Sequence, residues 1–172
     1  MKEKRPADGL LAAWKTSDRV TRYLVERLPP AIWEAPVPEV PRRTVRAIAA
    51  HLHNSRCSWI RTLGTEHGIT APAKVDRQRV SRRQLIAALR QSGRGIGALL
   101  ELGLAEGGQV PPSKRYVWRN LPLDVAHVLA YFVAHEAHHR GQLVMVARQL
   151  GHRIPSAVLG GIWHWTTRSR ES

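Results

Sequence analysis

The sequence predicts an all-α protein built as a four-helix bundle, with a short C-terminal helix or turn packed over it. Eleven prolines leave four long proline-free segments, and proline is disfavoured inside helices. Within each segment apolar residues recur at steps of three or four, and no segment shows the alternation typical of a strand. The 172 residues suit a single domain, spanning 1–172, with enough volume for a core.

Each predicted helix has a signal at one of its ends. Pro29-Pro30 stops the first helix, and a proline-rich connector follows it. Thr44 is suited to cap the second helix, and Ser81 with Gln84 has the spacing of a capping box for the third. Gly151 is typical of the C-terminus of the fourth. The predicted helices cover residues 8–28, 44 to 66 or 67, 81–102, 122–151 and, as a short last segment, 157–165.

Small and aromatic residues add detail to two of these segments. Gly93, Gly95 and Gly97 lie inside the third helix, where each costs about 1 kcal/mol relative to alanine. They indicate a kink, a break or a close approach of backbones, and the sequence leaves these three open. In the last segment we expect Trp163 and Trp165 to pack over the bundle.

Composition narrows the class of protein. The chain has 27 Lys+Arg against 13 Asp+Glu, a net charge of +14. This charge indicates either a surface that binds nucleic acid or an acidic partner, or a surface that only keeps the protein in solution. The basic residues are scattered, and no nucleic-acid-binding signature accompanies them. The lone Cys57 fits a reducing compartment, and we see neither a signal peptide nor a membrane-spanning stretch. We therefore expect a cytoplasmic protein.

The fourth predicted helix carries histidines on its apolar stripe. His135, His139 and Gln142 fall between Phe132 and Val146 on one face. Two imidazoles directed inward need partners, because an unsatisfied buried polar group costs about 1–3 kcal/mol. A divalent metal would engage both imidazoles at once.

A third histidine completes the predicted metal site. His51 lies three residues after Ile48 on the second helix and can face inward, whereas His53 is expected to lie on the solvated side. Cys57 is six residues from His51 and off its face, so we discount it as a ligand. Three neutral imidazoles, His51, His135 and His139, would hold a first-row metal and leave coordination positions open, as in catalytic sites.

Two other interpretations of these histidines remain. They are polar residues on a partly exposed helix, or His135 to His139 form the H-E-x-x-H motif of zincin metalloproteases, with Glu136 as general base. The second interpretation lacks a strand region for peptide binding, and Glu136 lies about 100° round the helix from His135. No catalytic residue can be assigned from the sequence.

Several stretches resemble the DinB family. Residues His135-Glu136-Ala137-His138-His139-Arg140-Gly141-Gln142 resemble the family signature HxxHHRGQ, and Ala50-His51-Leu52-His53 resembles its first histidine segment. The stretch 148–155 and the ending Trp163-His164-Trp165 also resemble the family, although His164 stands where an acidic residue is common. The resemblance spans most of the chain and is strongest in the fourth helix.

The resemblance implies a fold, a metal and a chemistry. The fold would be an up-down-down-up bundle, often a homodimer, with zinc or nickel on His51, His135 and His139. The activity would be that of a metal-dependent hydrolase or thiol S-transferase acting on a small molecule, with a low-molecular-weight thiol as cosubstrate. The alternative is a non-enzymatic, metal-stabilised binding protein whose basic surface engages nucleic acid or an acidic partner.

The residues around the histidines have more than one interpretation. Gly141 in mid-helix would permit close helix approach beside the site. Gln142 would either fix the tautomer of a ligand imidazole or satisfy backbone groups. Arg140 would pair with a carboxylate at a helix interface or dimer seam, or be solvated. His138 lies one residue off the inward face and would be a surface residue or support a ligand.

Overall fold

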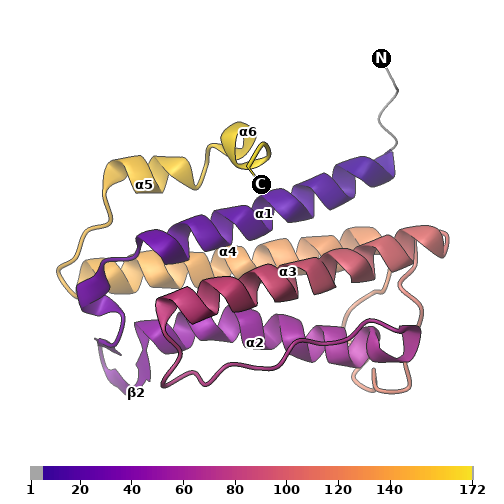
Figure 1. The fold of residues 1–172 in the computed structure, drawn as a ribbon, viewed down its shortest axis with the longest axis horizontal. Helices are drawn as coiled ribbons and strands as arrows, with labels where there is room; N and C mark the ends of the chain where they lie inside the picture. Colours follow the sequence, from indigo (N-terminus) through magenta and orange to yellow (C-terminus); the bar gives the residue numbers. More distant parts are fainter. Residues whose placement is uncertain (1–5, 172) are drawn as a thin grey trace.

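Four long helices dominate the computed structural model, which describes residues 6–171. They are α1 (Pro6–Arg27), α2 (Val45–Leu63), α3 (Arg82–Ala105) and α4 (Val125–Gln149). They lie side by side with their long axes roughly aligned (Figure 1), so that α1 and α2 each pack against both α3 and α4. The prediction of a mostly helical protein with four long helices is confirmed.

The helix ends follow the predicted capping signals with small shifts. Thr44 Oγ1 accepts a hydrogen bond from the Ala47 amide, and Ser81 with Gln84 forms the reciprocal capping box at the start of α3. The α-helical part of α2 ends at Leu63, and a separate 3-10 turn, η2 (Thr65–His67), follows it. The predicted end of this helix at residue 66 or 67 is therefore a few residues too late. A second 3-10 turn, η1 (Pro30–Ile32), follows α1.

A small hairpin precedes α2, where the sequence predicted a connector without strands. Its antiparallel strands are β1 (Pro36–Val37) and β2 (Val40–Thr44), with Val37 opposite Val40. Glu39, in the two-residue turn between them, has a φ of 62°. The expectation of no strand was wrong because so short a hairpin has no room for an alternating pattern, and prolines are tolerated at exposed strand edges.

The connection between α2 and α3 runs back along α2 (Figure 1). Asn54 holds this connector through hydrogen bonds to both the amide and the carbonyl of Val75, each 2.9 Å long. His53 lies beneath it, fully buried, with Nδ1 3.0 Å from Ser92 Oγ and Nε2 2.9 Å from the Ala73 carbonyl. The expectation that His53 is solvated was wrong, because the connector covers that side of the helix.

The core consists of two apolar clusters separated by buried polar residues. One cluster lies toward the C-terminal part of α1 and the start of α2, and the other toward the opposite end of the bundle. Along each helix, buried polar side chains fall between the residues of the two clusters. They are Thr16, Ser17, Asp18 and Thr21 on α1, His53 and Arg56 on α2, Ser92 on α3, and Glu136, His139 and Arg140 on α4.

Two glycines of α3 allow close packing of the helices. A Cβ on Gly93 would meet Asp18 Oδ1 at 2.6 Å, and a Cβ on Gly95 would meet Ile60 Cδ1 at 2.5 Å. Of the three possibilities that the sequence left open, close approach is the nearest to what is seen, but it is side chains of α1 and α2, and not backbones, that lie against the α3 backbone at these positions. The same idea fails for Gly141 on α4, because nothing lies within 4 Å of a Cβ placed there.

The C-terminal segment packs on α1, as predicted (Figure 1). It contains two short helices, α5 (Ser156–Gly161) and α6 (Trp165–Arg168). Arg19 of α1 donates hydrogen bonds to the carbonyls of Arg168 and Ser169. Trp163 does not take part in this packing, since 78% of it is exposed, which corrects the expectation that it packs over the bundle. Among the described residues, no helix is both long and apolar enough to cross a membrane.

Candidate metal centre

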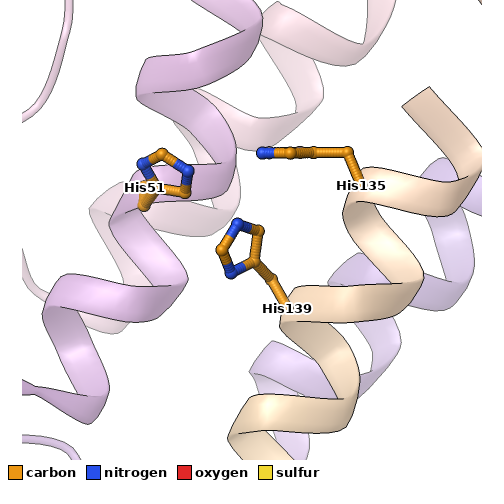
Figure 2. Close-up of side chains that lie close together, drawn as sticks. All are labelled: His51, His135 and His139. Atoms are coloured by element: carbon orange, nitrogen blue, oxygen red, sulfur yellow. The ribbon is translucent and has the colours of Figure 1, made fainter. Parts of the chain in front are cut away.

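Three histidines from two helices converge between α2 and α4 (Figure 2). His51 extends from α2, and His135 and His139 extend from successive turns of α4. One nitrogen or another of each ring lies within 4.8 Å of the corresponding atoms of the other two. The ring centroid of His139 is 4.6 Å from that of His51 and 4.6 Å from that of His135. The structure thus brings together the three residues that the sequence singled out.

Burial keeps these imidazoles in their neutral form. It lowers the pKa of His51 to about 4, and the neighbouring His139 adds to this effect. Burial also lowers the pKa of His135 to about 4, again with a contribution from His139. The pKa of His139 is lowered by burial as well, against the opposing effect of its hydrogen bond with Gln142. All three rings therefore have free nitrogen lone pairs near pH 7, as metal binding requires.

Gln142 and Arg43 fix the orientation of His139. Gln142 Oε1 lies 2.8 Å from His139 Nδ1 and also accepts a hydrogen bond of 3.3 Å from Arg43 Nη2. Because a guanidinium can only donate, the Gln142 atom between these two groups must be its oxygen. His139 Nδ1 must then carry a proton and donate it to that oxygen. The lone pair of the His139 ring consequently lies on Nε2, and of the two roles considered for Gln142, tautomer control is the one observed.

His138 is an exposed neighbour of the three histidines. Gln142 Nε2 lies 3.0 Å from His138 Nε2, and the rings of His138 and His139 are 4.9 Å apart. His138 therefore supports Gln142 from the solvent side. It is not part of the group whose nitrogens converge.

Glu136 lies in a buried ion pair, which rules out the protease interpretation of the H-E-x-x-H pattern. Only 1% of Glu136 is exposed. Its Oε1 accepts a hydrogen bond of 2.6 Å from Arg56 Nε, and its Oε2 accepts one of 2.6 Å from Thr21 Oγ1. A general base needs a free oxygen beside the metal, and both oxygens of Glu136 are occupied by hydrogen bonds from Arg56 and Thr21.

The ion pair extends into a network that the sequence analysis missed. Arg56 Nη1 donates to Asp18 Oδ1 at 2.7 Å and to the Leu89 carbonyl at 3.0 Å. Arg140 donates to Thr21 Oγ1 of α1 at 2.8 Å, and its Nη1 lies 3.8 Å from Glu136 Oε2, so Arg140 pairs with a carboxylate at the α1–α4 interface. A signal for Arg56 does exist: it lies four residues after Leu52 and four before Ile60, both fully buried.

Cys57 has no place among the three histidines. It is fully buried, and its Sγ lies 3.3 Å from Nε2 of His53. Burial raises the pKa of the Cys57 thiol, which disfavours the reactive thiolate. This agrees with the decision to discount it on sequence.

The donor set fits a borderline divalent metal. A tetrahedral zinc ion with bonds of about 2.1 Å holds its donors about 3.4 Å apart, so small rotations of imidazoles that already lie within 4.8 Å would close the site. Neutral imidazoles suit zinc, nickel, copper and iron, whereas calcium and magnesium prefer oxygen donors. Three protein ligands leave at least one coordination position open.

Comparison with known proteins identifies the family of this chain. A comparison with curated proteins gave no significant match. The family model described as the DinB family matches residues 1–170, nearly the whole chain, including all three histidines. This protein therefore belongs to the DinB family.

Proposed function

We propose that this protein binds a divalent transition metal, zinc or nickel, through His51, His135 and His139, and that it uses the metal to activate a thiol or water against a small molecule. The observation that carries the proposal is the convergence of three neutral imidazoles, of which His139 is locked in a tautomer with Nε2 free. Membership of the DinB family supports a metal at this position.

The chemistry follows from what the chain supplies and what it lacks. A metal with open positions lowers the pKa of a bound water or thiol, so that a nucleophile forms near neutral pH. The protein holds the three imidazoles, and Gln142 maintains the orientation of one of them. Because Cys57 is buried and carries a raised pKa, the thiol would come from a small cosubstrate. Of the two reactions considered, we favour thiol transfer over hydrolysis on the family resemblance alone.

The proposal includes the arrangement and setting expected from the family resemblance. We infer an up-down-down-up helix order, supported by the long return of the connector along α2 (Figure 1). We also expect a homodimer and a cytoplasmic location. Size-exclusion chromatography with light scattering tests the first of these two expectations.

A second candidate function is binding of nucleic acid or an acidic protein by the basic surface. A hollow of about 630 Å³ between α1 and α3 supports it. Its lining includes the basic residues Lys15, Arg19, Arg22, Arg90 and Arg94, together with the acidic residues Asp18 and Glu101. Phosphate contacts make affinity fall steeply with salt. Salt-dependent binding of DNA or RNA that survives metal removal would favour this function over the enzyme.

The deciding experiment is the metal content of tag-free protein, measured by mass spectrometry. We expect about one transition metal per chain in the wild type, and its loss in His139→Ala. His127→Ala is the matched control, since His127 is an exposed histidine on the same helix. Absence of metal in the wild type, even after incubation with zinc or nickel, would refute the proposal.

If the metal is present, activity can be tested directly. The metal-loaded protein is mixed with a small thiol and an electrophilic dye, and thiol consumption is followed by absorbance. Turnover that is abolished by a chelator and restored by the metal is the expected result. Equal rates with and without the chelator would show that the protein binds a metal but does not use it for this reaction.

A further inference from the structure

The surface beside the three histidines is strongly basic. A hollow of about 460 Å³ opens next to His51, and its lining contains Arg42, Arg43 and Arg77. No aspartate or glutamate is among the residues that line it. The arginines come from β2 and from the connector after α2, so the helices that hold the imidazoles do not supply this charge.

Two of these arginines are held in position by backbone or amide oxygens. Arg43 Nη2 donates to Gln142 Oε1 at 3.3 Å, and Arg77 Nε donates to the Ala47 carbonyl at 3.3 Å, one helical turn before His51. Arg43 remains under-used as a donor, because its Nε is buried and has no acceptor among the described residues. Neither guanidinium forms an ion pair with a carboxylate within residues 6–171.

Both guanidinium groups act electrostatically on the histidines. After burial and the effect of His139, the charges of Arg77 and Arg43 contribute to the lowered pKa of His51. They also contribute to the lowered pKa of His139. This places two fixed positive charges within electrostatic range of the site.

The charges around a bound metal would not balance. Three neutral imidazoles add no negative charge to a divalent cation. The nearest carboxylate along α4, Glu136, is buried and already paired with Arg56. A divalent metal beside Arg43 and Arg77 would therefore leave a large excess of positive charge, which an anionic ligand can reduce.

We propose that the site selects small molecules that carry a carboxylate or phosphate group, and that Arg43 and Arg77 bind this group while the metal holds the reacting atom. This proposal rests on the proposed function and adds the substrate class to it. Guanidinium groups pair with carboxylates and phosphates through two parallel hydrogen bonds, which fixes the orientation of the ligand. A second hollow that is also lined by Arg43, of about 380 Å³ and with Val37, Ile48 and Met145 in its lining, offers room for an apolar portion.

The test compares two small thiols of similar size, of which only one carries a negative charge on the group away from the sulfur. Mercaptopropionate carries a carboxylate, and mercaptopropanol carries a hydroxyl in its place. Their affinities for the zinc-loaded protein are measured by calorimetry, with metal content checked before and after. We expect mercaptopropionate to bind about tenfold more tightly than mercaptopropanol, since charge-assisted hydrogen bonds are about twice as strong as neutral ones. Competition by succinate and by inorganic phosphate then shows which anionic group the arginines prefer.

The variants Arg43→Gln and Arg77→Gln assign the preference to these residues. Each should reduce the difference between the two thiols to about threefold or less, and Arg77→Gln should do so by weakening mercaptopropionate alone. Arg77→Gln leaves the bond between Arg43 and Gln142 intact, so its effect cannot come from a displaced imidazole. Arg79→Gln is the matched control, because Arg79 lies on the same connector and is 89% exposed, and its loss changes the net charge equally.

The possible results separate this inference from the proposed function. If the wild type retains no metal, the proposed function fails and this inference fails with it. If the metal-loaded wild type binds both thiols equally, only the inference is overturned. The same conclusion follows if Arg79→Gln reduces the preference as much as Arg77→Gln does.

Discussion

The buried ion pair of Glu136 makes Glu136→Ala a decisive substitution. The wild-type carboxylate is 1% exposed and accepts hydrogen bonds of 2.6 Å from both Arg56 and Thr21. Alanine would leave Arg56, itself 1% exposed, with Asp18 as its remaining carboxylate partner. The substitution therefore removes half of the charge that compensates a fully buried guanidinium.

The expected loss of stability is large. Breaking a buried ion pair by removing one partner costs about 3–5 kcal/mol in the free energy of unfolding. For a chain of this size each kcal/mol shifts the melting temperature by about 2–4 °C, so Tm should fall by roughly 10 °C. Urea and thermal unfolding, followed by circular dichroism in the presence of a chelator, measure this without any contribution from bound metal.

A surface ion pair supplies the control. Glu34 is 74% exposed and pairs with Arg46 at 2.7 Å, so Glu34→Ala should cost less than about 1 kcal/mol. A cost below about 1 kcal/mol for Glu136→Ala as well would refute the assignment of Glu136 to a structural network.

In a double-mutant cycle, Glu136→Leu combined with Arg56→Met should cost less than the sum of the single changes, because no charge of the pair is left alone.

Two further predictions concern the supporting side chains. Gln142→Leu removes the acceptor of His139 Nδ1 and should weaken zinc affinity about 10- to 100-fold with little change in stability. Competition with a zinc chelator measures this affinity, and an unchanged affinity would mean that the amide does not orient the ring. Burial raises the pKa of Cys57, so at pH 8 a smaller fraction of this thiol is ionised than of a free cysteine. Alkylation of Cys57 should therefore be slow in the folded protein and fast in urea. Rapid labelling of the folded chain, measured by mass spectrometry, would contradict the burial of this thiol.

The helices and the histidine pair of α4 could be predicted because they depend on local periodicity. His135 and His139 share a face whatever the helix packs against, and prolines and capping residues limit where a helix can begin or end. The position of His51 on an inward face followed in the same way. Each of these features needs only the geometry of one helix.

The features that the sequence did not reveal depend on contacts between distant segments. His53 is buried only because the connector after α2 returns over it, and a helical wheel contains no information about that connector. Arg56 is compensated by Asp18 from α1 and Glu136 from α4, 38 and 80 residues away along the chain. A charged residue on an apolar face, such as Arg56 between Leu52 and Ile60, is therefore a sequence signal of a buried ionic network.

The hairpin before α2 adds positive charge beside histidines that extend from two helices. The imidazoles extend from α2 and α4, whose other faces form the core, whereas Arg43 extends from β2. Exposed positions of the hairpin tolerate more variation than the close-packed core, whereas Thr44 caps α2 and Val37 packs against the core. A protein of this architecture could therefore keep the three converging histidines and vary the charge beside them. Replacing Arg42, the exposed arginine of β2, by an acidic residue would change this charge and leave the hydrogen bond between Arg43 and Gln142 in place.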